Sequence, residues 1–450
     1  MSQTEIIRER ISADTDKELF YLIDLFKDGG MPGQDCHMKD LFAVAKTRPE
    51  SFRNHSKVLG LSFGGSNTKV ILGHTEDGEI YADYLMAQPN PDEHIHLFDY
   101  LDMICKTPVI DDYLRNTPQL EIGVSIPMFI IDRCPYSVTK IPTIEGFIAR
   151  DMSQIGPEFD FEKNFAEYMA SRGYTNPYHL YYQSDGIVAH IGAVSVADVG
   201  PNDKPMLCVC GTGMATSDET MYYIPAYLTT CIPDDEELWP AADTENRQLN
   251  YAIAGKGLFG LMRHACELRV RLGGSALEGK QFAGAFATAK DSRKVGELAQ
   301  KAAGVPYDEG IIAGLRDIAG EDGLAEMEEI ALIIMKRCWE SLSNTIISTC
   351  ISTGPLENGG KYVVFLEGSV ARNALVKPMI LKDIEEKKAK YEFAAADGAH
   401  IDLDYVFDPD LRKVRTADPA LEPLLKSIDV TLIGAMTMVM ADEIAQDTKG

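Results

Sequence analysis

The sequence predicts an α/β fold in two lobes, and three observations support this prediction. The chain has 450 residues, which is more than one ordinary domain. Hydrophobic residues make up 45% of it, so it can bury a core and global disorder is excluded. A group of strands followed by helices occurs twice, which is typical of α/β proteins. The two groups share a pattern and not residues.

The first group begins after an amphipathic helix expected over 15–28, which ends at Gly29-Gly30. Short apolar, β-branched runs bounded by turn residues then predict strands. These runs are 58–63, 68–72, 80–85, 121–126 and 178–183. A helix is expected next, over 186–197.

The second group begins with an apolar run over 205–210, followed by a glycine turn and a return through 222–224. A buried strand is expected at 362–366. Apolar periodicity predicts helices elsewhere in this half. They are expected at 248–272, 281–303, 308–319, 324–350 and 423–447.

Charge and cysteine usage restrict the class of protein. The formal net charge of −26 argues against non-specific nucleic-acid binding, which needs a positive surface. Nine scattered cysteines, an odd number, indicate reduced thiols and no disulfide framework. The first 20 residues lack an apolar signal, and the apolar run 430–441 is shorter than the ~20 residues that span a bilayer. We therefore expect a cytoplasmic protein with no membrane segment.

Two strand–glycine–strand elements are candidate phosphate loops. The first is LSFGGSNTK at 61–69, and the second is CVCGTGMA at 208–215. Glycine lets backbone N–H groups approach a phosphate closely, and Ser66, Asn67 and Thr212 add side-chain donors. A plain hairpin turn uses the same residue types, so each loop alone fits both interpretations.

Taken in order, the motifs of the chain resemble those of the hexokinase family, within the actin-like sugar-kinase superfamily. The resemblance covers most of the chain, and no single piece is decisive. The matching segments are ELFYLIDLFKDGGM (18–31), LGLSFGGSNTKVIL (59–72), IGVSIPM (122–128), TIEGFIARD (143–151), QSDGIVAHIGA (183–193), VCGTGMATS (209–217), RQLNYAIAGKGLFGLMRHACEL (247–268) and FLEGSVARN (365–373).

This resemblance implies a two-lobed actin-like ATPase (ribonuclease H-like) fold with a central cleft. ATP would lie between the two glycine turns, and the sugar against the small lobe. On this basis we expect a small lobe of 57–185 plus 434–450, and a large lobe of 1–56 plus 186–433.

The resemblance also implies roles for single residues. Asp185 matches the catalytic Asp, although an Asp at this place could also merely cap the helix that follows. Ser125 matches the Ser of the sugar loop. The residues matching the phosphate and nucleotide loops are Gly64, Gly65, Ser66, Asn67 and Lys69 in the first, Gly211, Thr212 and Gly213 in the second, and Gly368 and Ser369 beside the nucleotide.

Several positions depart from the family pattern. The first phosphate loop of the family begins with an Asp that helps to hold hydrated Mg²⁺, and here that position is Ser62. The other departures fall on expected sugar-binding positions, where a lost hydrogen-bonding partner changes which sugar is accepted. These are Glu145, where the family has Lys, Ser184, where it has Asn, and Asn250, where it has Glu. Near the C-terminus, a glycine-rich nucleotide run is reduced to Gly434-Ala435.

The sequence thus predicts an ATP-dependent sugar kinase of hexokinase type. It would transfer the γ-phosphoryl group to a hexose primary hydroxyl, with Asp185 as general base and with ATP and Mg²⁺ as cofactors. A catalytically weak or dead sugar- or nucleotide-binding regulator is the alternative, and another transferase of the same fold is a third. The expected partners are a small-molecule sugar and a nucleotide, with no nucleic acid and no membrane. No side chain is assigned as a metal ligand, and the sequence leaves the sugar and the oligomeric state open.

Overall fold

The protein is described by a computed structural model of the chain. The residues it describes are 2–12, 14–27, 38–64, 67–91, 95–127, 129–131, 134–136, 144–145, 161–211, 213–219, 222–223, 235, 237–238, 249–354, 356, 359–391, 403–406 and 413–448.

The chain divides into two units, and each is built from several stretches of sequence. Unit 1 comprises Met1–Gly30, Met206–Asp218 and Tyr223–Phe407. Unit 2 comprises Met31–Pro205, Glu219–Tyr222 and Asp408–Gly450. This division differs from the lobes expected from the sequence, because 31–56, 186–205, 219–222 and 408–433 fall into the same unit as 57–185.

A six-stranded sheet organises unit 2, in the order β15-β3-β2-β1-β5-β9. β1 and β2, like β2 and β3, are antiparallel, whereas β5 is parallel to both β1 and β9. The carboxyl ends of β1, β5 and β9 therefore meet at one edge. The strands are β1 (His55–Phe63), β2 (Asn67–Glu76), β3 (Glu79–Pro89), β5 (Leu120–Ile126), β9 (Tyr178–Ser184) and β15 (Val414–Arg415).

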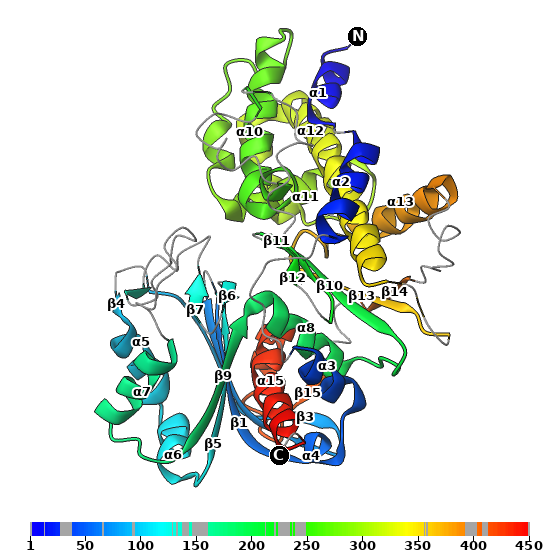
Figure 1. Cartoon of the computed structure of the whole chain (residues 1–450). Coiled ribbons are helices and arrows are strands. Elements are labelled where there is room, and N and C mark those ends of the chain that lie inside the picture. Colours follow the sequence, from blue (N-terminus) through cyan, green and yellow to red (C-terminus); the bar gives the residue numbers. More distant parts are fainter. Residues whose placement is uncertain are drawn as a thin grey trace. The chain divides into compact units, whose positions relative to one another are not determined.

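Helices cover both faces of this sheet (Figure 1). One face carries α5 (Leu97–Cys105), α6 (Pro108–Asn116) and α7 (Phe161–Ser171), which share one apolar core with β1 and β5. The other carries α3 (Met38–Thr47), α8 (Asp185–Val196) and α15 (Val430–Asp447). Shorter elements complete the unit. They are α4 (Glu50–Arg53), β4 (Ile95–His96) paired with β8 (Ile144–Glu145), β6 (Phe129–Ile131) paired with β7 (Cys134–Tyr136), and a 3₁₀ segment at Glu422–Ser427.

The backbone of α15 lies in direct contact with its neighbours. A Cβ atom at Gly123 of β5 would lie 1.7 Å from the carbonyl oxygen of Ala435, and one at Gly434 would lie 1.8 Å from that of Val188 in α8. Glycine alone leaves room for such an approach. Because α15 joins α3 and α8 to the sheet, the residues around 31–56 and 186–205 belong to unit 2.

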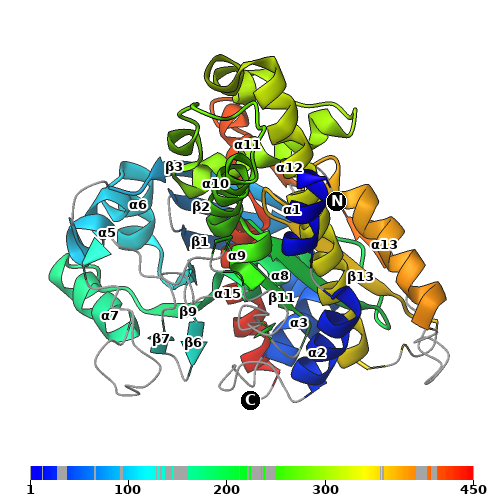
Figure 2. The ribbon, with the colours of Figure 1, turned by 90° about the horizontal axis from the view of Figure 1, so that it is seen from above.

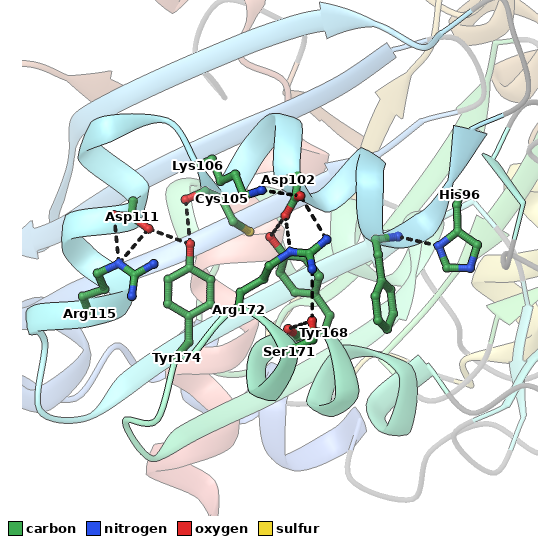
Figure 3. Close-up of polar contacts among 11 residues, drawn as sticks. His96, Asp102, Cys105, Lys106, Asp111, Arg115, Tyr168, Ser171, Arg172 and Tyr174 are labelled. Carbon is green, nitrogen blue, oxygen red and sulfur yellow. Dashed lines mark hydrogen bonds and ion pairs between the residues drawn. The ribbon is translucent and has the colours of Figure 1, made fainter.

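A polar network holds α7 and the following turn to α5 and α6 (Figure 3). Asp102 accepts hydrogen bonds from Arg172 Nε at 2.7 Å, Arg172 Nη2 at 3.0 Å and the Tyr168 hydroxyl at 3.1 Å. Burial acts to raise the pKa of Asp102, but these hydrogen bonds outweigh it, so the pKa is lowered. Nearby, burial raises the pKa of the Cys105 thiol to about 12. A thiol that stays protonated is inert, and we interpret this network as structural.

Unit 1 combines a five-stranded sheet, in the order β12-β11-β10-β13-β14, with a group of helices. Its strands are β10 (Lys204–Cys210), β11 (Met214–Ser217), β12 (Tyr222–Tyr223), β13 (Tyr362–Glu367) and β14 (Leu403–Val406). The central helix is α12, and α2 and α13 run beside it (Figure 2). The helices are α1 (Gln3–Ile11), α2 (Thr15–Lys27), α9 (Leu249–Ile253), α10 (Gly255–Arg271), α11 (Ser292–Ala302), α12 (Glu309–Ser352) and α13 (Val376–Tyr391).

Some predicted helix boundaries were wrong. The helix expected over 281–303 begins only at Ser292, because the Asp291 carboxylate accepts the N–H groups of Ala287 and Thr288 and closes 3₁₀ turns instead. The two helices expected at 308–319 and 324–350 are confirmed: they lie within α12, whose helical backbone breaks at Gly320 with a φ of 74° and a ψ of 175°. The last helix starts at Val430 and not at 423, because Asp429 caps it.

The structure describes the state of several cysteines and the apolar character of the helices. Six cysteines whose side chains the structure describes are free and buried: Cys105, Cys208, Cys210, Cys266, Cys338 and Cys350. Within the part of the chain that the structure covers, none of the helices has the length and apolar character to cross a bilayer.

Candidate functional site

In unit 2, polar residues gather where three parallel strands end. The strand register pairs Ser62 of β1 with Ser125 of β5, and Ile126 of β5 with Ser184 of β9. Asp185 follows directly as the first residue of α8. Ligands of open α/β sheets bind beyond the carboxyl ends of such strands. The structure therefore brings Ser125, Ser184 and Asp185 to one edge of the sheet. Ser62, which occupies the position where the family has an Asp, lies at the same edge.

Asp185 does not cap its helix. The capping position belongs to Ser184, whose side chain makes no capping hydrogen bond, and α8 begins at Asp185 itself. Burial, together with the negative charge of Asp429, raises the pKa of Asp185 to about 6, and a hydrogen bond from the Gly186 backbone acts in the opposite direction. A carboxyl group with this pKa is mostly ionised at neutral pH and still basic enough to accept a proton.

Ser125 is fully buried, and its Oγ has no hydrogen-bond partner among the described residues. Leaving a buried hydroxyl unpaired is costly, so such a group in a native structure calls for an explanation. A ligand hydroxyl bound at this edge would supply the missing partner.

The first glycine loop is a tight turn closed by its own backbone. The N–H of Gly64 donates to the Asn67 carbonyl at 2.8 Å, and a Cβ at Gly64 would lie 2.8 Å from that same oxygen. The Asn90 side chain donates to the Gly64 carbonyl at 2.8 Å and so supports the turn. Gly65 and Ser66 lie outside the described residues. The sequence analysis did not predict a role for Asn90. The only local signal is its position between two prolines.

Lys69, expected to face a phosphate, forms an ion pair with Asp429. Asp429 also caps α15 by accepting the Leu432 N–H at 2.9 Å. Sequence reasoning missed Asp429, although an Asp directly before an apolar helical run is a capping signal. Lys69, Asp429 and Asp185 thus form one electrostatically coupled group in unit 2.

In unit 1, the second glycine loop is joined to the start of α10. The N–H of Gly211 donates to the Gly213 carbonyl at 2.9 Å, and the Gly255 N–H donates to the Gly211 carbonyl at 2.7 Å. Thr212 lies outside the described residues. Because α10 is 17 residues long, its dipole places partial positive charge beside this loop. An N-terminus of this kind favours an anion such as phosphate.

The loop after β13 lies against the second glycine loop. Gly368 has a φ of 95°, a conformation that favours glycine. A Cβ there would also lie 2.4 Å from the carbonyl of Cys210, so the close packing requires glycine as well. The backbone N–H groups of Val370 and Ala371 donate to that carbonyl. The structure therefore brings Gly211 close to Gly368 and Ser369, and Gly213 to Gly211 through their backbone hydrogen bond.

Two expected sugar-binding residues are described only through their backbone. Glu145 lies in β8, where it pairs with His96 of β4. Asn250 lies in α9, directly before α10. The structure thus fixes their elements and does not describe their side chains.

Comparison with solved structures identifies the fold. A crystal structure of a hexokinase matches with a TM-score of 0.62 at 16% identity, covering 98% of this chain and 98% of that one. The hexokinase from Schistosoma mansoni complexed with glucose matches with a TM-score of 0.56 at 12% identity, covering 94% of this chain and 99% of the other.

No protein-family model and no curated protein sequence matches the chain. The structural matches nevertheless extend over nearly the whole length of both partners. The prediction of the fold class is confirmed: the chain has the two-lobed α/β fold of the hexokinases, an actin-like ATPase fold.

Proposed function

We propose that the chain is an ATP-dependent sugar kinase that phosphorylates a hexose primary hydroxyl, with Asp185 as general base. The observation that supports this most is the edge formed by Ser125, Ser184 and Asp185. There a carboxyl group whose pKa is raised to about 6 stands beside a buried hydroxyl without a partner. The carboxylate would take the proton of the attacking hydroxyl, and Ser125 would orient the sugar.

The nucleotide would be bound by backbone groups. The loops of unit 1 at Gly211–Gly213 and Gly368–Ser369, with the N-terminus of α10, supply N–H groups and positive potential. In unit 2, Gly64–Asn67 and Lys69 would hold phosphate oxygens. Ser62 offers a hydroxyl and no carboxylate, so Mg²⁺ would be held mainly by the phosphates and water. We place this activity in the cytoplasm, where the buried free thiols stay reduced.

The test is a coupled assay of ADP release with Mg·ATP over a panel of hexoses and amino sugars, repeated with GTP and pyrophosphate as donors. We expect sugar-dependent ADP release with at least one sugar. Phosphorylation at the primary hydroxyl is checked by NMR of the product.

The alternative is a regulator that binds sugar or nucleotide without turnover, and Ser62 is the observation that favours it. Its side chain is buried at the edge of the sheet, where a metal-binding Asp was expected from the resemblance. If no sugar releases ADP, and Ser62→Asp does not restore activity while sugar or nucleotide binding is still measurable, the regulator is the better assignment.

Replacing Asp429 with Asn is expected to move the acidic limb of the activity profile to lower pH. The Asp429 charge contributes to the raised pKa of Asp185, so a neutral amide lowers that pKa and keeps the base ionised in more acidic solution. The kcat/KM profile should rise with an apparent pKa near 6 in the parent protein and at lower pH in the variant. An unchanged profile would show that the two carboxyl groups are not coupled.

A further inference from the structure

Three potential metal ligands meet at the end of the unit 2 sheet opposite to Asp185. His55 begins β1, Glu121 is the second residue of β5, and Glu443 lies near the end of α15. Because β1 and β5 are parallel, His55 and Glu121 both lie at their amino ends, far along the strands from Ser62 and Ser125. The His55 Nε2 atom lies 3.4 Å from Glu121 Oε2 and 3.1 Å from Glu443 Oε2. The three ligand atoms are all within 4.8 Å of one another.

The group is buried on one side and open on the other. Glu121 is only 5% exposed, and its Oε2 has no hydrogen-bond partner among the described residues. The His55 side chain is 8% exposed, whereas that of Glu443 is 37% exposed, so an ion can enter from solvent past Glu443. A buried carboxylate oxygen without a hydrogen-bond partner, directed into a cluster of ligands, is the kind of group that a cation would satisfy.

The imidazole is oriented for metal binding. His55 Nδ1 lies 3.2 Å from the Ser56 carbonyl, a contact in which Nδ1 must carry the proton. Nε2 is then the atom that presents its lone pair to the two carboxylates. A hydrogen bond from the second ring nitrogen to a backbone carbonyl is the usual outer support of a metal-ligating His.

The spacing of the ligand atoms suits a small ion. Ligands about 2.0–2.1 Å from a tetrahedral Zn²⁺ lie about 3.3 Å from one another. The two separations from His55 Nε2, 3.1 Å to Glu443 Oε2 and 3.4 Å to Glu121 Oε2, bracket this value. One imidazole and two carboxylates leave a fourth position for water, and a nitrogen ligand favours Zn²⁺ over Mg²⁺, which prefers oxygen alone.

We propose that His55, Glu121 and Glu443 form a divalent metal site with Zn²⁺ as the preferred ion, separate from the Mg²⁺ of the nucleotide. The ion would tie the starts of β1 and β5 to the last helix, so its role is structural. Without a cation, the carboxyl groups of Glu121 and Glu443 repel each other when both ionise.

The experiment measures zinc binding to the full-length chain by isothermal titration, with Zn²⁺ alone as the probe. We compare the parent protein with Glu121→Gln and His55→Gln, each of which removes one ligand. The matched control is His179→Gln. His179 pairs with Glu121 in the strand register, contacts Asp442 of α15 through Nε2 at 2.7 Å, and lies outside the cluster.

We expect one Zn²⁺ per chain, affinity at least tenfold lower in both ligand variants, and affinity within about twofold of the parent in His179→Gln. Co²⁺ should give visible d–d bands without a thiolate charge-transfer band, which separates this site from the cysteines. Zinc should raise the melting temperature of the parent protein and not that of Glu121→Gln. This second readout needs no activity and keeps the test decisive if His55→Gln fails to fold.

Three results would overturn the proposal: no zinc binding by the folded parent protein, binding that Glu121→Gln leaves unchanged, or a thiolate band with Co²⁺. None of them depends on whether the chain phosphorylates a sugar.

Discussion

Asp185→Asn is expected to lower turnover by roughly two or more orders of magnitude while nucleotide binding persists. The amide keeps the shape of the side chain but cannot accept the proton of the sugar hydroxyl. Because Asp185 starts α8 without capping it, the substitution removes no helix cap. A variant that turns over sugar at an undiminished rate would rule out Asp185 as the base, whereas a loss of nucleotide affinity would point to general damage.

A stability measurement provides the control for this variant. The pKa of Asp185 is raised in the folded state, from 3.8 to about 6, so folding favours the protonated form. Its contribution to stability is therefore complete below about pH 4 and is lost as the pH rises through about 6. At pH 8 the Asn variant, which is always neutral, should melt above the parent protein, and at pH 4 the difference should vanish. Melting curves at these two pH values check this.

The second large effect is expected in unit 1, where Arg337→Met should destabilise the protein by about 3–5 kcal/mol. Arg337 of α12 and Glu18 of α2 form an ion pair whose members are 2% and 0% exposed. Burial alone would raise the pKa of Glu18, but Arg337 outweighs it and lowers the pKa. Asn344 supports the carboxylate with a 3.1 Å hydrogen bond. Without Arg337, Glu18 is left as a buried carboxylate without its charge partner.

Urea denaturation monitored by circular dichroism measures this loss. The matched control is Arg316→Met, which breaks an ion pair with Glu309 on the same helix, where the two side chains are 39% and 44% exposed. Such an exposed pair contributes at most about 1 kcal/mol. The double variant Glu18→Leu, Arg337→Met should recover much of the loss, because no charge is left buried. Equal effects at Arg337 and Arg316 would contradict this account.

The strands of unit 2 could be predicted because burial on both faces leaves continuous apolar runs in β1 and β5. The helices α5, α6 and α7 were missed. They have 9 to 11 residues, too few for the apolar period to stand out, and tertiary packing in the shared core holds them. Helix α3, for which the sequence analysis predicted no element, is held in the same way against α8 and α15.

For the candidate site, the local residues were predictable and their distant partners were not. Ser125 lies near the end of one recognisable strand, and Asp185 follows another. The strand pattern of the sequence therefore predicts where both residues lie in the fold. Asp429 is brought to Lys69 across 360 positions of sequence, and no local pattern announces such a contact. Gly434, taken as the remnant of a nucleotide motif, is required by the contact between α15 and the Val188 carbonyl.

The position of α15 has a consequence for biosynthesis. Unit 2 begins near residue 31, but α15, which fills one face of its sheet, is translated only after almost all of unit 1. Until then Gly60 and Gly123 face no helix backbone, and the apolar face they belong to lacks the helix that packs on β1 and β5. During the synthesis of more than 200 further residues, the sheet of unit 2 therefore lacks α15 on one face. Exposed apolar surface of this kind promotes aggregation and is bound by chaperones.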